Sequence, residues 1–140
     1  MCFFVNQFEF INYHNIPTRY GSETDVRNIK VLCEEINYEF EAHHNLTIAK
    51  MRAFLQQFKS NKRSSRKDQL EPYDSFIFFF SSHGNEHGIY CRDSNVGDSN
   101  VVRFSEIVKV LKTSDCFGEK PVLIFFLCCR GGLFFITTFP

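Results

Sequence analysis

Tryptophan is absent from this sequence, and its 140 residues include only seven glycines and four prolines. Such a composition argues against a small secreted protein held together by disulfides, although six cysteines are present. Cys128 and Cys129 are adjacent and cannot pair with each other without strain. We therefore expect reduced thiols, and 18 phenylalanines to build the core.

An excess of either charge is also missing, because 16 Lys and Arg residues balance 16 Asp and Glu residues. Neither nucleic acid nor an acidic membrane surface is indicated as a partner. The segment 59–68 carries basic residues but no aromatic side chain that could stack on bases. We interpret it as a solvated loop.

No apolar run reaches the length of a membrane span. The first five residues are too short an apolar segment, and too soon followed by polar residues, to be a secretory signal. The length suits a single domain with one core, without a recruitment domain before the first strand. We expect a soluble, cytoplasmic protein.

Strand and helix patterns alternate along the chain. Alternating or continuous apolar residues predict strands, and apolar residues three and four apart predict helices. The predicted strands are 2–10, 38–42, 76–80 and 122–127, with a short hairpin formed by 89–90 and 101–102. The predicted helices follow a capping box at Ser22 and Asp25, a cap at Thr47, and Phe104. This order implies an α/β fold, in which a mainly parallel sheet has helices on both faces and functional loops at its carboxyl edge.

Two of the predicted strands, both expected to be buried on both faces, lead into reactive side chains. Residues 76–80 run into Ser82-His83-Gly84, and residues 122–127 run into Cys128-Cys129-Arg130-Gly131. A thiol and an imidazole at the carboxyl ends of such strands can meet in space. The imidazole can then accept the thiol proton and later protonate a leaving amine, which is the chemistry of a nucleophilic cysteine.

These motifs resemble those of the caspase family. Ser82-His83-Gly84 matches the family's histidine motif, and Cys129-Arg130-Gly131 matches the end of its Gln-Ala-Cys-Arg-Gly motif. Residues 19–25, Arg-Tyr-Gly-Ser-Glu-Thr-Asp, resemble the family's Arg-x-Gly-Thr-x-x-Asp. The resemblance runs from about Cys2 to Gly132 and is to the large catalytic subunit.

The resemblance implies a cysteine endopeptidase that cleaves after Asp in apoptosis, needs no cofactor, and acts on proteins with an exposed Asp. Cys129 would be the nucleophile and His83 the general acid and base. The backbone amides of Gly84 and Cys129 would form the oxyanion hole. Arg19 would bind the substrate carboxylate through its guanidinium fork.

Each residue also has a structural interpretation. Cys129 can be a buried cysteine, His83 a loop histidine, and Arg19 a solvated surface charge. Because side chains alternate along an extended segment, Cys128 should face the core if Cys129 faces the cleft. A zinc site of His83, His87 and the two cysteines is disfavoured, since adjacent cysteines seldom supply two tetrahedral ligands.

Two departures from the family pattern affect the substrate site. Leu127 occupies the position of the family's substrate-binding glutamine, and an unsatisfied buried group there costs about 1 to 3 kcal/mol. Residues 133–140 form an atypical hydrophobic tail where the family has its small subunit. We predict a caspase-like large-subunit domain over 1–132 whose sheet is incomplete at one edge, where either the tail or a partner covers the last strand.

Three functions are compatible with these residues. The first, which we favour, is an Asp-directed cysteine endopeptidase that is inactive as this chain alone and associates with a caspase small subunit or in a homodimer or heterodimer. The second is a non-catalytic decoy or regulator that binds caspase subunits. The third is a parallel-sheet binding domain without thiol chemistry.

Overall fold

A computed structural model describes residues 1–12, 14–59, 65–95, 100–129 and 137–139. Its main sheet has the strand order β2-β1-β3-β6-β7, and β4 and β5 form a separate antiparallel ribbon. The strands are β1 (Cys2–Asn6), β2 (Phe40–His44), β3 (Phe76–Ser81), β4 (Gly88–Ile89), β5 (Val102–Arg103), β6 (Val122–Leu127) and β7 (Thr137–Phe139). The helices are α1 (Ser22–Glu35), α2 (Ile48–Gln56), α3 (Ser65–Leu70) and α4 (Phe104–Lys112).

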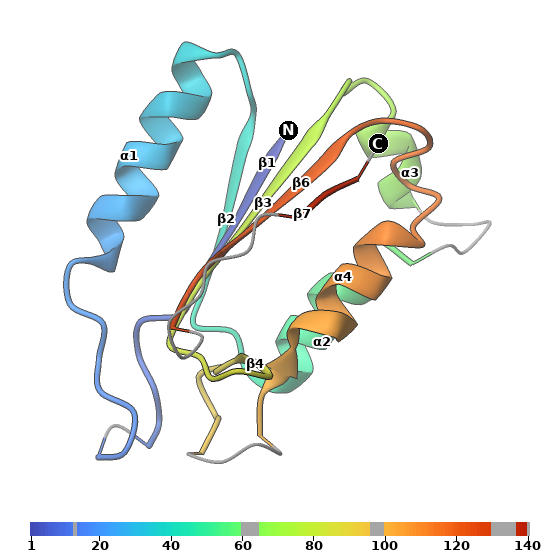
Figure 1. The fold of residues 1–140 in the computed structure, drawn as a ribbon. Helices are drawn as coiled ribbons and strands as arrows, with labels where there is room; N and C mark the ends of the chain where they lie inside the picture. Colours follow the sequence, from blue (N-terminus) through green and yellow to red (C-terminus); the bar gives the residue numbers. More distant parts are fainter. Residues whose placement is uncertain (13, 60–64, 96–99, 130–136, 140) are drawn as a thin grey trace.

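Strands β2, β1, β3 and β6 are parallel, and α1 lies on one face of the sheet while α2 and α4 lie on the other (Figure 1). The predicted α/β class, with a mainly parallel sheet and helices on both faces, is confirmed. Parallel strands joined by helical crossovers place all their carboxyl ends at one edge. The loops after β1, β3 and β6 therefore lie near one another.

The face under α2 and α4 holds the aromatic core, which we call the packed face. Phe3, Phe58, Phe78 and Phe117 are at most 2% exposed. The ring of Phe78 lies 4.8 Å from that of Phe3, 5.3 Å from that of Phe58 and 5.8 Å from that of Phe117. Rings at these separations bury large areas and attract one another, so this face supplies most of the apolar burial.

The face under α1, which we call the thin face, is only partly covered. Ser22 and Cys33 are the buried residues of α1, while Leu32 and Ile36 are each 47% exposed. On this face, Ile77 and Phe79 of β3 and every second residue of β6 are only half-buried, so the prediction that residues 76–80 and 122–127 are buried on both faces is wrong. Of the apolar stripe predicted from residue spacing for this helix, Cys33 is buried, Val26 and Ile29 are half-buried, and Leu32 and Ile36 are exposed.

Two predicted boundaries need correction. The first strand ends at Asn6 rather than at residue 10, because the Asn45 side chain accepts the backbone N–H groups of Phe8 and Glu9 and turns the chain away from the sheet. The predicted solvated loop 59–68 overlaps α3, where Arg66 stacks over the Phe3 ring and pairs with Glu41 at 2.8 Å. Residues 60–64 lie outside the described residues.

The two predicted helix caps have different outcomes. Thr47 caps α2, because its hydroxyl accepts the backbone N–H of Lys50 at 3.2 Å. The capping box before α1 is wrong, since Gly21 is the N-cap residue and no side chain caps this end. Gly21 has a φ of 86°, which glycine adopts without steric cost, and Ser22 instead accepts a hydrogen bond from the Asn6 side chain.

The outer edge of β6 is paired with the end of the chain. Strand β7 runs antiparallel to β6, and its three residues pair with Val122, Leu123 and Ile124. The carboxyl half of β6, residues 125–127, has no pairing with β7. The sequence left open whether the tail or a partner covers this edge, and β7, the described part of the tail, covers the first half of β6. Residues 133–136, which we expect to be β-prone, lie outside the described residues.

Candidate active site

The carboxyl edge of the sheet carries a row of residues set by strand register. Asn6, Ser81 and Leu127 are direct neighbours across β1, β3 and β6. The backbone N–H of Ser82 then donates to the Leu127 carbonyl at 3.2 Å, which extends the pairing by one step. His83 and Cys129 each follow this row by two residues.

Gly84 joins the histidine loop to the cysteine loop. A Cβ atom at Gly84 would lie 2.8 Å from the Gly88 carbonyl oxygen, 3.1 Å from that of Cys129 and 3.3 Å from the Cys128 Cβ. Contacts this short leave no room for a side chain. The loops that carry His83 and Cys129 are therefore in direct contact, and their catalytic roles stay predictions.

His83 is oriented by a backbone carbonyl. Its Nε2 lies 2.8 Å from the Pro17 oxygen, and its ring packs 5.5 Å from the ring of Phe10. A carbonyl oxygen can only accept a hydrogen bond, so Nε2 carries the proton and Nδ1 is the basic nitrogen of the neutral ring. Burial lowers the pKa of His83, Arg19 lowers it further, and the bond to Pro17 opposes both. The imidazole is thus held in the neutral form that a general base requires.

The six cysteines, none of which forms a disulfide, differ strongly in access. Cys129 is exposed, whereas Cys128 is half-buried against the aromatic core. Burial raises the pKa of Cys91 to about 12 and also raises the pKa of Cys2, so neither is a reactive thiolate. The positions of Cys128 and Cys129 fit the predicted alternation, and Cys129 is the accessible thiol at this edge; Arg130 and Gly131 lie outside the described residues.

The Arg19 side chain points toward the row formed by Asn6, Ser81 and Leu127. Its Nη1 donates to the Gln7 carbonyl at 3.0 Å and to the Asn6 Oδ1 at 3.4 Å, and its Nη2 donates to the Ser81 Oγ at 3.0 Å. The interpretation as a solvated surface charge is therefore wrong. Burial lowers the pKa of Arg19, whereas Asp25, Cys128 and Cys129 raise it, so the guanidinium lies within electrostatic range of both thiols.

Leu127 lies in the same row, next to Ser81. Its side chain is half-buried on the thin face and carries no hydrogen-bonding group. The structure thus brings His83, Gly84, Cys129, Arg19 and Leu127 to one edge of the sheet. Sequence reasoning missed Asn6, Pro17 and Ser81. The one available signal was the polar residue Ser81 at the end of the apolar run of β3.

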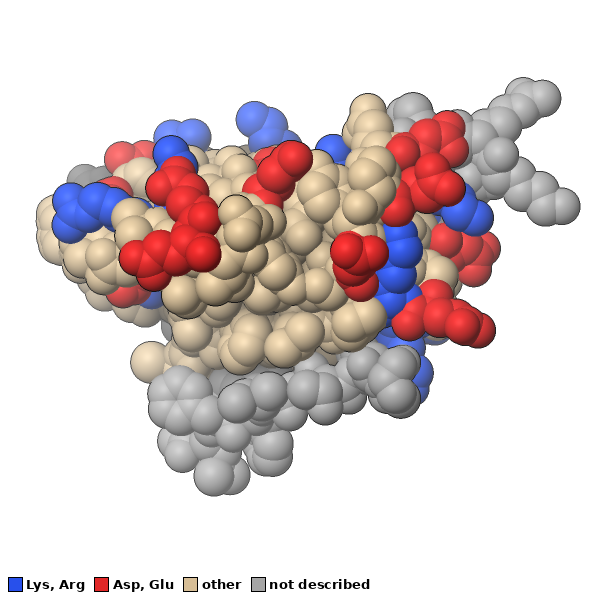
Figure 2. All heavy atoms as spheres, turned by 90° about the horizontal axis from the view of Figure 1, so that it is seen from above, with Lys and Arg blue, Asp and Glu red and all other residues tan. Residues whose placement is uncertain are grey.

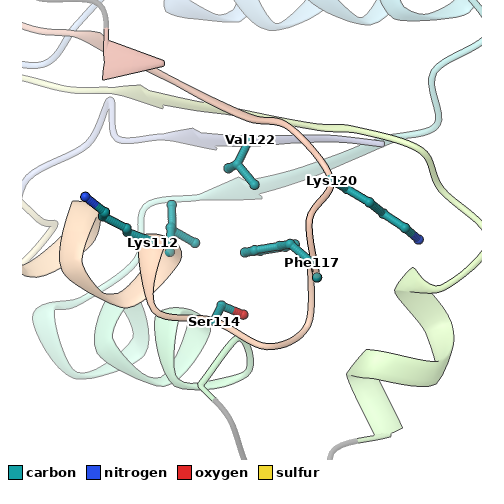
Figure 3. A pocket seen from close by; sticks show the side chains of 7 residues that line it. Lys112, Ser114, Phe117, Lys120 and Val122 are labelled. Carbon is teal, nitrogen blue, oxygen red and sulfur yellow. The ribbon is translucent and has the colours of Figure 1, made fainter. Parts of the chain in front are cut away.

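A separate cavity of ≈ 250 Å³ lies at the opposite end of β6, between the end of α4 and the start of the strand (Figure 3). Phe117 lines it, and Lys112 and Lys120 extend away from it in opposite directions. Lys120 donates instead to the Glu71 carbonyl at 2.5 Å. The cavity lies at the end of the strand far from Cys129.

Within the described part of the chain, no group of three or more His, Cys, Asp or Glu side chains is placed to hold a metal ion. No helix of that part combines the length and apolar character that a membrane span requires. Acidic and basic side chains are interspersed on the face seen in Figure 2.

Comparison with known proteins agrees with this geometry. The family model of the caspase domain matches residues 1–136. The chain belongs to the caspase family. Caspase-1 of Sus scrofa is 29% identical over 121 residues, which are 85% of this chain and 28% of the relative. Caspase-1 of Equus caballus is 31% identical over 123 residues, with the same shares, and caspase-4 of Mus musculus is 25% identical over 122 residues, or 86% of this chain and 31% of the relative.

The chain therefore spans less than a third of the length of these caspases. The region matched by the caspase-domain model includes His83, Gly84, Cys129 and Arg19. Leu127, in the row at the carboxyl edge, carries no group that could hydrogen-bond to a carboxylate.

Proposed function

We propose that this caspase-family chain carries the catalytic site of an endopeptidase that cleaves after Asp. The observation that carries the proposal is the contact of Gly84 with the Cys129 carbonyl, because it holds the histidine and cysteine loops against each other. The bond from His83 to Pro17 and the position of Arg19 supply the two further requirements, a basic Nδ1 and a cation for the substrate.

The chemistry begins with attack of the Cys129 sulfur on the carbonyl carbon of the peptide bond. The thiol proton passes to Nδ1 of His83, and the backbone N–H groups of Gly84 and Cys129 stabilise the oxyanion. His83 then gives the proton to the leaving amine, the C–N bond breaks, and a thioester remains on Cys129. Water attacks the thioester, its proton returns through His83 to the thiolate, and the acid is released.

Arg19 would select the Asp side chain. Its described hydrogen-bond acceptors are all neutral, so the guanidinium charge is not neutralised by a hydrogen-bonded carboxylate. Asp25 acts on Arg19 electrostatically, and a carboxylate from a substrate would add a hydrogen-bonded negative charge. The planar fork of Arg favours a bidentate pair with it.

The wider role is proposed from the family. As the resemblance to the caspase family implies, the chain would act on proteins with an exposed Asp, in the cytoplasm and during apoptosis. A caspase small subunit or a second caspase chain is the proposed partner, because Phe79 and Phe125 are half-buried on the thin face and residues 125–127 have no pairing with β7.

A non-catalytic regulator of caspases is the second candidate, and Leu127 is the observation that favours it. An apolar side chain in the row beside Arg19 cannot bind the substrate carboxylate. Such a chain would keep the fold and the partner surface of a caspase subunit while binding substrate weakly.

Labelling with an Asp-containing electrophilic peptide separates the two candidates. The endopeptidase proposal predicts that the peptide alkylates Cys129, identified by mass spectrometry, and that Cys129→Ser removes the label. Arg19→Lys should abolish most labelling, because an ammonium cannot reproduce the fork. Iodoacetamide controls for thiol reactivity. Modification of Cys129 by iodoacetamide but not by the Asp peptide would favour the regulator.

A further inference from the structure

Ser81 is a fully buried polar residue on the thin face. It follows Ile77 and Phe79 on the same side of β3, so the strand pattern predicts an apolar side chain there. A buried hydroxyl is costly unless it is hydrogen-bonded, and the Ser81 Oγ lies 3.0 Å from Nη2 of Arg19. The hydrogen bond to Arg19 therefore offsets the cost of burying the Ser81 hydroxyl.

Some N–H groups of the Arg19 guanidinium are used in hydrogen bonds within the protein, and the others remain available to a ligand. Nη1 is held by the Gln7 carbonyl and the Asn6 side chain, both on the β1 side. Among the described residues, Ser81 is the one that binds Nη2. Without it, the planar group would be anchored through a single nitrogen and could turn about that point. Nε and one hydrogen of Nη2 are left for a ligand.

Strand register connects Ser81 to the departure at Leu127. The two residues are direct neighbours across β3 and β6, in the row where Leu127 offers no polar group. On the β3 side of this row, Ser81 is therefore the polar side chain that contacts the Arg19 guanidinium.

We propose that Ser81 is a positioning residue that fixes the orientation of Arg19 and thereby determines selectivity for Asp over Asn. The selectivity part rests on the proposed function, whereas the orientation part does not. Ser81 acts through Arg19 and takes no part in bond formation or cleavage.

Ser82 provides a matched control. It is the next residue, is 2% exposed, and also uses its hydroxyl in a buried hydrogen bond, donated to the Tyr90 carbonyl at 2.7 Å. The described hydrogen bonds of Arg19 do not include the Ser82 side chain. Ser81→Ala and Ser82→Ala therefore remove the same group from neighbouring buried sites, and only the first loses a bond to the guanidinium.

The experiment uses two readouts on the full chain. The first is the side-chain ¹⁵N spectrum of Arg19 without ligand, which reports rotation of the guanidinium. The second is the ratio of labelling rates at Cys129 for an electrophilic peptide containing Asp and for its Asn counterpart. Ser81→Ala should speed rotation and lower the ratio by about tenfold, while Ser81→Thr, which keeps the hydroxyl, should restore both. Ser82→Ala should leave both unchanged.

An unchanged Arg19 spectrum in Ser81→Ala would overturn the proposal, and so would a changed spectrum with an unchanged ratio. Equal changes in Ser81→Ala and Ser82→Ala would show a purely structural role and overturn it as well. If the unsubstituted chain shows no preference for the Asp peptide, the proposed function fails and selectivity fails with it. The ligand-free spectrum then still decides whether Ser81 orients Arg19.

Discussion

The two faces of the sheet differ in what covers them and in what they carry. The packed face buries Phe3 and Phe78 completely under α2 and α4, whereas the thin face has one helix, α1, whose Leu32 is nearly half exposed. Figure 1 shows these helices on opposite sides of the sheet. Arg19 and Ser81 lie at the carboxyl end of the thin face. The aromatic packing and the proposed substrate contacts therefore lie on opposite sides of the same strands.

The reason is visible in the alternation of β3. Successive side chains point to opposite faces, so Phe78 joins the aromatic core while Phe79 and Ser81 face α1. On the packed face, the Arg66 guanidinium is paired with Glu41 and lies over the rings of Phe3 and Phe58. On the thin face, the described hydrogen-bond acceptors of Arg19 are all neutral.

The largest expected effect comes from substituting neighbouring phenylalanines on β3. Phe78→Ala should lower the free energy of unfolding by about 3 to 5 kcal/mol, because its ring is fully buried among other rings. Phe79→Ala should cost only about 1 to 2 kcal/mol, since that ring is half-buried. Denaturant unfolding measures both, and equal losses would contradict the difference between the faces.

Gly84→Ala should damage the site more than the fold. The new methyl group would meet the carbonyls of Gly88 and Cys129 and push the histidine loop away, so labelling of Cys129 by the Asp peptide should fall by at least about tenfold. Gly118→Ala is the control, because Gly118 has a φ of 59° and open space around it. It should lose about 1 kcal/mol of stability and keep its labelling rate. Similar labelling in both variants would mean that the loop contact is unimportant.

Breaking the β6–β7 pair should expose the edge of the sheet. Thr138→Pro removes a backbone N–H and fixes φ, so β7 should detach from Leu123 and the protein should self-associate. Thr138→Ala keeps the N–H and should behave like the unsubstituted chain. Size-exclusion chromatography over a range of concentrations measures self-association. A proline variant that stays monomeric would contradict the prediction.

The smallest expected effect is a pH dependence from His83. Its pKa is lowered in the folded protein, so below about pH 6.5 the unfolded chain binds this proton before the folded protein does. Stability conferred by the neutral ring is present above pH 6.5 and is lost as pH falls through the folded pKa. The unsubstituted chain should therefore lose stability relative to His83→Gln as the pH falls below about 6.5, which unfolding curves at several pH values measure. A gain in its relative stability at low pH would require a raised pKa.

Much of the fold could be predicted from apolar periodicity, because long apolar runs such as 76–80 and 122–127 have few alternatives in a chain of this length. The half-buried state of β6 could not be predicted, since a continuous apolar run looks the same whether or not a second layer covers it. The end of β1 was missed because it depends on Asn45, which lies 36 to 37 residues away from the N–H groups it binds.

The candidate site shows the same division. His83, Gly84, Cys129 and Arg19 could be selected from motifs and their order. Their supporting groups could not, because Ser81 and Pro17 act through contacts that only the folded chain creates. Leu127 was recognisable as a departure, but its position beside Ser81 depends on strand register.

The most direct test is the response of two arginines to one alkylation. Arg19 lies on the thin face near Cys129, whereas Arg66 lies on the packed face, over the Phe3 ring and paired with Glu41. Side-chain ¹⁵N spectra should be recorded before and after Cys129 reacts with the Asp peptide. We predict that Arg19 and His83 shift while Arg66 does not. An unchanged Arg19 signal after complete modification of Cys129 would contradict the conclusion that the thin face carries one assembled site.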